Sequence, residues 1–311
     1  MEDFRFSVWT PTFNRVCFLV RLYESLKQQS FKDFEWIIVD DGSNDNTKEI
    51  VDGFMAENKI KSIRYLKKNN GGKHTAWRMV TKEFRSKYVV TIDSDDRLTE
   101  NALEIFDRHW RDLEKSEEYE DFWEIKGRVQ DAEGLMIGKP LPTKIFDSTY
   151  DELTYKYKYT WEMHACRKTS VLQNEGKVPD EFLFDSLCSN FSESIRWSRV
   201  GQKYKSRFID DIVRTYFFDA TDTLTKSNKK TRSIKNTYNT LIDAKYTIEE
   251  RKKWMLKWDK KSYVFSYATL LYTSFCLSKN PFSILDKASI SDNLLLGVLY
   301  FPILIIYKIR K

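Results

Sequence analysis

In the first hundred residues of the chain, short apolar runs typical of strands alternate with segments whose apolar residues recur at helical spacing. Short apolar runs, typical of buried strands, cover residues 5–10, 35–39, 63–66 and 88–92. Between these runs, apolar residues recur at helical spacing and predict helices within residues 16–26, after residue 47 and over residues 75–84. Repeated strand and helix units of this kind predict a doubly wound, mostly parallel, Rossmann-like α/β sheet.

Polar loops follow each of the predicted strands. Their sequences are Pro11-Thr12-Phe13-Asn14-Arg15, Asp40-Asp41-Gly42-Ser43, Asn69-Asn70-Gly71-Gly72-Lys73-His74 and Asp93-Ser94-Asp95-Asp96. Ligands of such sheets bind beyond the carboxyl ends of the strands, so the four loops are expected to share one site. Each loop alone is compatible with an ordinary turn, and the prediction rests on their combination.

The last of these loops is an acidic run that closes an apolar strand. Mg²⁺ and Mn²⁺ prefer carboxylate and water oxygens, usually with one or two protein carboxylates while substrate phosphates complete the coordination sphere. Asp and Ser are also frequent in turns and at helix caps. Together with the other loops, however, the acidic run predicts a site for a nucleotide diphosphate and a divalent cation.

Four segments carry a family resemblance: TPTFNR at residues 10–15, IIVDDGSNDNT at 37–47, NGGKHTA at 70–76 and DSDD at 93–96. In these segments the chain resembles the family 2 glycosyltransferases with a GT-A fold. A looser likeness continues through SESIRWSRV at 192–200 and TYFFDATDTLT at 215–225. The resemblance implies a nucleotide-sugar donor, most often a UDP-sugar, and an inverting transfer of the sugar to an acceptor hydroxyl.

The resemblance also implies roles for individual residues on the donor side. Pro11 and Asp41 look like contacts to the base, and Asn70 and Arg78 look like contacts to the nucleotide or its diphosphate. The expected nucleotide-binding set is completed by Thr12, Asn14, Arg15, Lys73, Asp93 and Ser94.

For the cation, Mn²⁺ or Mg²⁺, the resemblance implies Asp95 as the principal ligand and Asp93 as a ribose or metal-side ligand. Members of the family differ in which acid of this run touches the ion, so the role of Asp96 stays open. The ion would neutralise the departing diphosphate.

An inverting transfer also needs a base within hydrogen-bond reach of the attacking hydroxyl. Glu193 is the candidate, because it lies in a segment similar to the one where these enzymes carry that carboxylate. A capping glutamate at a helix start is the alternative, and three nearby acids could also be the base: Asp180, Glu181 and Asp185. Trp161, Glu162 and His164 are weaker candidates for the acceptor pocket.

Composition fits an enzyme of this kind. The 311 residues, 41% of them apolar, suffice for a catalytic domain over residues 1–225 and a smaller region over 226–311. Within the first, residues 1–97 are expected to bind the nucleotide and residues 98–225 the acceptor. The four cysteines show no paired metal-ligand spacing, so free cytosolic thiols are expected. The acidic start shows no signal peptide, which predicts a site that faces the cytoplasm.

The excess of positive over negative charge lies in the C-terminal third, which also contains two long apolar stretches. Residues 226–261 hold twelve Lys or Arg and four Asp or Glu, with aromatic residues among them. No nucleic-acid-binding motif accompanies them, and an anionic lipid surface attracts such segments as well. Apolar stretches follow at residues 263–277 and 294–307; the second is too short to span a bilayer and contains Pro302. We expect helices that lie on the inner face of the cell membrane, with packing on the catalytic domain or a homo-oligomer interface as the alternatives.

A membrane location would suit a lipid-linked acceptor, and the resemblance implies a polyprenyl-linked saccharide of a bacterial surface polysaccharide such as a capsule. Two other functions remain open. The chain could be a degenerate nucleotide-binding scaffold of a membrane glycan-assembly complex, although Asp93 and Asp95 are intact. It could also be a nucleotidyltransferase, although the loop after the first strand lacks the glycines that would cradle a triphosphate. The same loop lacks the G-x-G-x-x-G of a dinucleotide-binding oxidoreductase.

Overall fold

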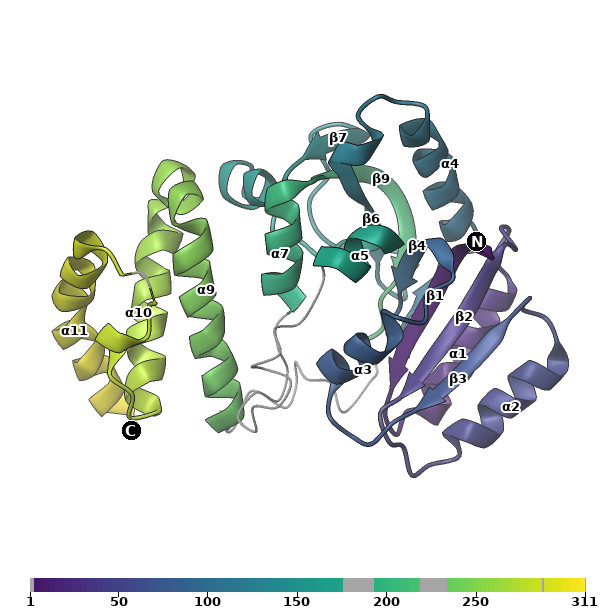
Figure 1. The fold of residues 1–311 in the computed structure, drawn as a ribbon, viewed down its shortest axis with the longest axis horizontal. Coiled ribbons are helices and arrows are strands. Elements are labelled where there is room, and N and C mark those ends of the chain that lie inside the picture. Colours follow the sequence, from purple (N-terminus) through teal and green to yellow (C-terminus); the bar gives the residue numbers. More distant parts are fainter. Residues whose placement is uncertain (1–2, 176–192, 219–233, 287, 311) are drawn as a thin grey trace. The chain divides into compact units, whose positions relative to one another are not determined.

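A computed structural model describes residues 3–175, 193–218, 234–286 and 288–310, which form two compact units (Figure 1). Among these residues, the first unit holds 3–150, 159–175 and 200–218, and the second holds 151–158, 193–199 and the C-terminal helices. The elements of the first half of the chain are β1 (Phe4–Thr12), α1 (Val16–Lys27), β2 (Phe34–Asp40), α2 (Thr47–Glu57), β3 (Ile63–Lys67), α3 (Lys73–Val80), β4 (Ser86–Thr91), β5 (Arg97–Leu98), α4 (Ala102–Glu114), η1 (Tyr119–Asp121), β6 (Phe122–Gln130) and β7 (Ile145–Ser148). The second half contains η2 (Glu152–Lys156), β8 (His164–Lys168), α5 (Thr169–Glu175), α7 (Glu193–Lys203), β9 (Lys205–Thr215), α9 (Ile234–Trp258), α10 (Lys260–Cys276), η3 (Pro281–Ser283) and α11 (Ile290–Arg310).

The first unit is built on a nine-stranded sheet whose first four strands are parallel. The strand order is β3-β2-β1-β4-β8-β6-β9-β5, and β7 pairs with β9. Strand β1 pairs in parallel with β2 on one side and with β4 on the other, so the chain reverses its direction of winding at β1. This arrangement confirms the predicted doubly wound, largely parallel sheet and the four predicted strands.

Alternate residues of the parallel strands face two different helical layers. On one face, Phe6 and Val8 of β1 belong to a core that includes apolar residues of α1, α2 and α4. On the other face, the ring of Trp9 packs at 5.4 Å from that of Trp77 in α3. Because successive side chains of a strand point to opposite faces, a run that is apolar at every position is buried on both sides. The helices thereby hold the strand ends in place.

The second half of the sheet is mixed, which the sequence pattern did not predict. Strand β8 lies antiparallel between β4 and β6, whereas β6 and β9 are parallel. The far end of β9 pairs with the two-residue strand β5, in the register Arg97 to Thr215 and Leu98 to Arg214. This pairing brings the end of β9 beside the acidic run that precedes β5.

The second unit contains the three long helices of the C-terminal region. Helices α9, α10 and α11 share a core that includes Leu241, Ile248, Tyr267, Leu270 and Leu296. The apolar stretches predicted at residues 263–277 and 294–307 lie within α10 and α11.

Helix α11 is longer than the apolar run that marked it. It begins earlier because the hydroxyl of Ser289 donates to the carboxylate of Asp292 at 2.6 Å, while the backbone N–H of Asp292 donates to that hydroxyl at 3.3 Å. Pro302 lies inside the helix and does not end it.

Candidate functional site

The carboxyl ends of the parallel strands are joined by backbone hydrogen bonds just beyond each strand. The N–H of Asp41 donates to the carbonyl of Thr12 at 2.9 Å, and the N–H of Ile92 donates to the carbonyl of Trp9 at 3.0 Å. The N–H of Lys68 donates to the carbonyl of Asp40 at 2.9 Å. The predicted loops therefore start from one edge of the sheet, as the sequence pattern indicated.

The loops after β1 and β2 are also tied together through side chains. The backbone N–H of Asn14 donates to the hydroxyl of Ser43 at 2.9 Å, and the N–H of Asn44 donates to the side-chain oxygen of Asn14 at 2.9 Å. Asn14 has a positive φ of 52°, a conformation that asparagine tolerates better than most residues. Asn14 thus shapes the loop that was predicted to contact the nucleotide.

Asp41 holds the third loop against the second. Its carboxylate accepts hydrogen bonds from the backbone N–H groups of Gly71 at 3.0 Å and Gly72 at 2.7 Å, and it pairs with the ammonium of Lys68. Gly42 has a φ of +88°, and a Cβ there would lie 2.9 Å from the backbone N of Asn70. The side chain of Asp41 is buried in this contact, and its predicted role toward a base stays a prediction.

Asp93 pairs with Lys73 at the start of α3. The Lys73 Nζ lies 2.8 Å from Asp93 Oδ1. Burial by the surrounding protein would raise the pKa of Asp93, but the positive charges of Lys73 and Arg214 outweigh it and lower that pKa to about 2. Asp93 is therefore ionised at neutral pH, as a metal ligand must be.

Asp95 pairs with the loop after β1. The Arg15 guanidinium lies 2.8 Å from Asp95 Oδ2, and Arg21 of α1 donates to the backbone carbonyl of Asp95. Arg15 was predicted as part of the nucleotide-binding set, whereas Arg21 was not singled out. Asp95 thus lies between two cationic side chains, in surroundings that would also attract a diphosphate.

Asp96 is the most deeply buried acid of the run, with 1% of the residue exposed. Its Oδ2 lies 2.6 Å from a guanidinium nitrogen of Arg214, and its Oδ1 accepts the backbone N–H of Phe217 at 3.4 Å. Burial raises the pKa of Asp96 to about 7, against the lowering effect of Arg214. Arg214 also reaches Glu162 at 3.1 Å.

The site also contains Arg214 and Lys68, which the sequence pattern did not single out. Arg214 directly precedes the segment TYFFDATDTLT that carries the looser family likeness, and it follows the apolar residues Ile212 and Val213. An arginine in such a place signals a buried partner, because the charge must be paired. Lys68 lies directly before the polar loop and gave no comparable signal.

His164 opens β8 beside the same residues. The residue is 4% exposed, and its Nε2 has no hydrogen-bond partner in the described parts of the chain. Burial, together with the charges of Arg214 and Arg167, lowers the pKa of His164 well below its usual range, so the imidazole is neutral. The structure therefore brings Glu162 and His164 to the acidic run.

The other predicted residues of the first unit lie around this centre. Thr12 and Ser94 are buried, and Pro11 is half-buried at the end of β1. Asn70 and Arg78 are exposed on the loop and helix that follow β3. Trp161 is 46% exposed and packs on Gly138, where an added Cβ would lie 2.7 Å from the Trp161 side chain.

Glu193 belongs to the second unit, at the start of α7. Its carboxylate lies 3.4 Å from the indole N–H of Trp197 and 3.9 Å from Arg196. The base role of Glu193 stays a prediction, and the alternatives Asp180, Glu181 and Asp185 lie outside the described residues. Among the cysteines, Cys17, Cys166 and Cys276 are free, in agreement with the expected thiols, and Cys188 lies outside the described part.

The described residues contain no group of three His, Cys, Asp or Glu side chains that would hold a metal by themselves. The donor set fits a different kind of site, in which one or two carboxylates bind Mg²⁺ or Mn²⁺ and substrate phosphates complete the sphere. Asp95 and the ionised Asp93 provide such carboxylates. Asp96 is engaged by Arg214 and fits a ligand role less well.

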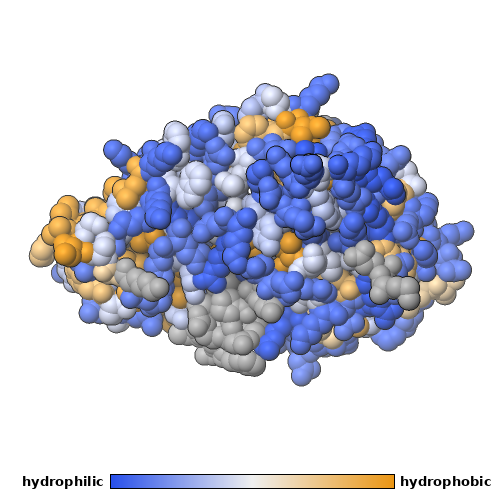
Figure 2. Space-filling model, turned by 45° about the horizontal axis from the view of Figure 1, so that its top comes forward, coloured by the Kyte–Doolittle hydropathy of each residue, from blue (hydrophilic) through white to orange (hydrophobic). Residues whose placement is uncertain are grey.

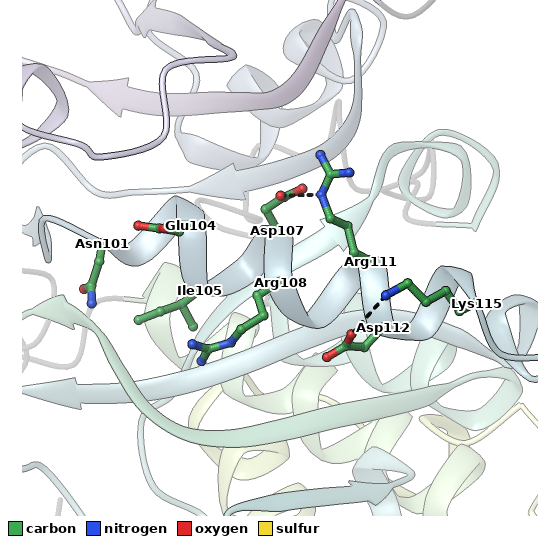
Figure 3. Close-up of a pocket in the computed structure, with 8 residues that line it drawn as sticks. All are labelled: Asn101, Glu104, Ile105, Asp107, Arg108, Arg111, Asp112 and Lys115. Carbon is green, nitrogen blue, oxygen red and sulfur yellow. Dashed lines mark hydrogen bonds and ion pairs between the residues drawn. The ribbon is translucent and has the colours of Figure 1, made fainter.

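A separate hollow of about 560 Å³ lies along α4 (Figure 3). Charged side chains dominate its lining, and two ion pairs, Asp107 with Arg111 and Asp112 with Lys115, run along the helix surface. None of the predicted site residues lines this hollow. Such i,i+3 and i,i+4 pairs are typical of an ordinary solvated helix face.

Comparison with known proteins connects the acidic-run site to a family. Residues 7–116 match the family model described as glycosyl transferase family 2. The glycosyltransferase GlyG of Streptococcus pneumoniae is 36% identical over 99 residues, which cover 32% of each chain. The GalNAc(5)-diNAcBac-PP-undecaprenol beta-1,3-glucosyltransferase of Campylobacter jejuni is 28% identical over 235 residues, 73% of this chain and 69% of that protein. The chain spans a third or less of the length of the first curated relatives that it matches.

Solved structures resemble the fold over most of the chain. TarS residues 1–349 of S. aureus, in complex with UDP-GlcNAc, give a TM-score of 0.55 at 19% identity and cover 94% of this chain and 78% of that one. The mannosyltransferase PcManGT of Pyrobaculum calidifontis, in complex with GDP-Man and Mn²⁺, gives a TM-score of 0.53 at 13% identity, with 98% and 84% covered. These likenesses confirm the GT-A fold with helices at its C-terminal end.

Proposed function

Because residues 7–116 belong to glycosyl transferase family 2, we propose that this glycosyltransferase moves a sugar from a UDP-sugar to a hydroxyl of a lipid-linked saccharide. The transfer would invert the anomeric centre and depend on Mn²⁺ or Mg²⁺. The product would be part of a bacterial surface polysaccharide.

One observation carries the proposal. Each carboxylate of the acidic run after β4 is paired with a cation from a different part of the first unit: Asp93 with Lys73, Asp95 with Arg15 and Asp96 with Arg214. Such a cluster of alternating charges at the carboxyl ends of parallel strands suits a diphosphate with its cation, because the basic groups attract phosphate and the acids attract the metal.

Residues around the acidic run would bind different parts of the nucleotide-sugar donor and its cation. Arg15 and Lys73 would bind the diphosphate, and Asp95 with Asp93 would hold the cation. When bound, the cation supplies positive charge that stabilises the departing nucleotide. The loops that Asp41 and Asn14 stabilise would bind the nucleoside. Pro11, Asn70 and Arg78 would contact the bound nucleotide from these loops and from α3.

The attacking hydroxyl would lose its proton to Glu193. Its carboxylate is partly exposed, and Trp197 and Arg196 at the next helical turn orient it. A base of this kind must stay ionised and within hydrogen-bond reach of the acceptor. Trp161 is exposed and would offer a flat surface to a saccharide.

The lipid-linked acceptor draws support from helix α11. Residues Ile290–Ile309 form a helix long and apolar enough to cross a membrane, and 11% of its apolar 18-residue stretch is buried. Among the described residues it is the one helix of this kind. Its exposed apolar side chains recur every three or four residues, at Ile290, Leu294, Val298, Phe301, Ile305 and Ile309. Figure 2 shows hydrophobic side chains gathered over this helix, at the left of the view. We propose that this stripe places the enzyme on the cytoplasmic face of the membrane.

Exposed charge at the turn between α9 and α10 supports the same placement. Lys253, Lys257, Lys260 and Lys261 are exposed there, beside exposed Trp258 and Phe265. Lysines attract anionic headgroups, and aromatic rings settle at the interface between headgroups and acyl chains.

Calorimetric titration tests the proposal. The purified chain is titrated with UDP, GDP and CDP, each with and without Mn²⁺. We expect Mn²⁺-dependent binding of UDP. Binding of none of the three would overturn the proposal and favour a scaffold that does not transfer sugar. Turnover of a nucleoside triphosphate with a sugar phosphate would favour a nucleotidyltransferase instead.

A further inference from the structure

Arg214 at the end of β9 forms two ion pairs with partners from distant parts of the chain. One guanidinium nitrogen lies 2.6 Å from Asp96 and another lies 3.1 Å from Glu162. The Arg214 side chain is 8% exposed, that of Asp96 is 1% exposed, and that of Glu162 is 57% exposed. Arg214 therefore joins a buried acid of the acidic run to an acid at the surface of the site.

The sheet explains why this arginine occupies its place. Strand β9 pairs with β5 in antiparallel register, so Arg214 lies opposite Leu98, two residues after Asp96. The backbone of Phe217, just beyond β9, donates to Asp96 from the same side. Two strands and a buried ion pair thus fix the guanidinium, which leaves its second nitrogen directed at the segment before β8.

We propose that Arg214 is a positioning residue that couples the acidic run to the segment of residues 160–163 and so sets the place of the Glu162 carboxylate at the site. This inference rests on the proposed function, because it assigns Asp96 to the donor side of the site and Glu162 to the acceptor side, with Arg214 as the bridge between them. Arginine suits the task because its planar guanidinium presents several N–H groups in a fixed fork, and one group can serve two carboxylates at once.

The bridge also leaves Asp96 with a role of its own. Its carboxylate is occupied by Arg214 and by the backbone of Phe217, so Asp96 anchors β9 to the acidic run while Asp93 and Asp95 remain for the cation. The buried His164, the first residue of β8, interacts electrostatically with Arg214 and Asp93.

The test uses the full chain with four variants: Arg214→Gln, Arg214→Lys, Glu162→Gln and Arg207→Gln. Arg207 is the matched control, because it lies on the same strand and pairs with Asp147 at 2.8 Å, and both residues lie outside the candidate site. Two quantities are measured in each: hydrogen exchange of the backbone at residues 160–163 and 94–98, and the affinity for UDP with Mn²⁺.

We expect Arg214→Gln to speed exchange at both segments about tenfold and to weaken UDP affinity at least fivefold, because the acidic run then loses the ion pair that holds it against β9. Arg214→Lys should restore UDP affinity but not the protection of residues 160–163, since one ammonium cannot reach both acids. Glu162→Gln should speed exchange at residues 160–163 alone, and Arg207→Gln should change neither quantity at the site.

Unchanged exchange at residues 160–163 in both Arg214→Lys and Glu162→Gln would overturn the coupling, even if Arg214→Gln fails to fold. Arg214→Gln effects no larger than those of Arg207→Gln would overturn it as well. If the unmodified chain binds no UDP with Mn²⁺, the proposed function fails, while the exchange measurement still decides whether Arg214 joins the two segments.

Discussion

The ammonium group of Lys73 lies 2.8 Å from the carboxylate of Asp93, so the first turn of α3 is joined to the end of β4. We predict that Lys73→Met weakens Mn²⁺-dependent UDP binding about tenfold, which corresponds to about 1.4 kcal/mol, the scale of one charge-assisted hydrogen bond. The measurement is calorimetric titration at two salt concentrations, because losing a phosphate-binding cation should also reduce the salt dependence. Lys48→Met is the control, since Lys48 is exposed and pairs with Asp52 one turn further along α2. Equal losses in both variants would refute a specific role for Lys73.

Asp95 and Glu193 should fail in different ways when they are replaced. Asp95→Ala should abolish the effect of Mn²⁺ on UDP binding. Glu193→Gln should keep UDP binding within twofold but lower the transfer rate by a factor of about 10²–10⁴, the usual contribution of a general base. Titration with UDP and an assay of UDP release in the presence of acceptor membranes separate the two effects. Unchanged turnover in Glu193→Gln would move the base role to another acid.

Gly42 occupies a backbone conformation that other residues avoid. With a φ of +88° and a Cβ position 2.9 Å from the backbone N of Asn70, Gly42→Ala should lower the free energy of unfolding by about 1–3 kcal/mol. Gly53 in α2 has no atom within 4 Å of its Cβ position, and Gly53→Ala should raise that free energy by about 0.5–1 kcal/mol. Urea denaturation of both variants measures these two changes in the free energy of unfolding. Equal effects would mean that the contact between the two loops carries no stability.

Glu114 should make the stability of the first unit depend on acid. Although burial would raise the pKa of Glu114, hydrogen bonds from Arg5, Lys87 and Tyr88 lower it to about 2. Between about pH 4.5 and 2 the unfolded chain binds the proton more readily, so this stabilisation is complete above pH 4.5 and is lost as the pH falls toward 2. Because solvent screens this partly exposed carboxylate, its contribution is at most about 3 kcal/mol.

Glu114→Gln should therefore destabilise the protein at pH 6 and progressively less toward pH 2. Urea denaturation of both proteins at pH 6, 4 and 3 gives the difference in the free energy of unfolding. A difference that does not change with pH would show that Glu114 titrates normally in the folded protein.

The exposed stripe of α11 can be tested without disturbing the helix pack. Val298 and Phe301 are 72% and 70% exposed, so the double variant Val298→Gln and Phe301→Gln should fold but bind anionic vesicles about tenfold more weakly. Leu135→Gln, which changes an exposed leucine of the first unit, should bind as before. A truncation at Asn293 is a poorer test, because it removes Leu296, which is fully buried in the core of the second unit. Unchanged vesicle binding of the double variant would exclude the stripe as the membrane contact.

The first half of the fold could be predicted because each parallel strand there carries a short run of mostly apolar residues and the helices between them show apolar residues at helical spacing. Strand β2, with the sequence FEWIIVD, is buried throughout and has one natural place in the middle of a sheet. The site loops followed from strand order, since all parallel strands end at one edge. The acidic run could be placed for the same reason.

The second half could not be predicted, because its order depends on contacts between distant segments. Strand β8 contains His164 and Lys168, both buried, and its polar sequence hides its place beside β4. The partner of Asp96 depends on the register of β9 against β5, which no local pattern encodes. Helix α11 extends past its apolar run because a polar cap at Ser289 and Asp292 starts it.

The pairing of β8 with β4 and of β9 with β5 affects how the protein folds during its synthesis on the ribosome. Residues 7–116, which match the family model, do not include the strand that pairs with the second edge of β4. That edge stays unpaired until residue 168 has emerged from the ribosome, and Asp96 lacks its partner Arg214 until residue 214 has emerged. An early-released fragment would therefore expose an unpaired strand edge and leave Asp96 without its ion-pair partner. Nascent chains halted before β9 should be digested readily by protease, and a fragment cut at residue 116 is a poor choice for expression.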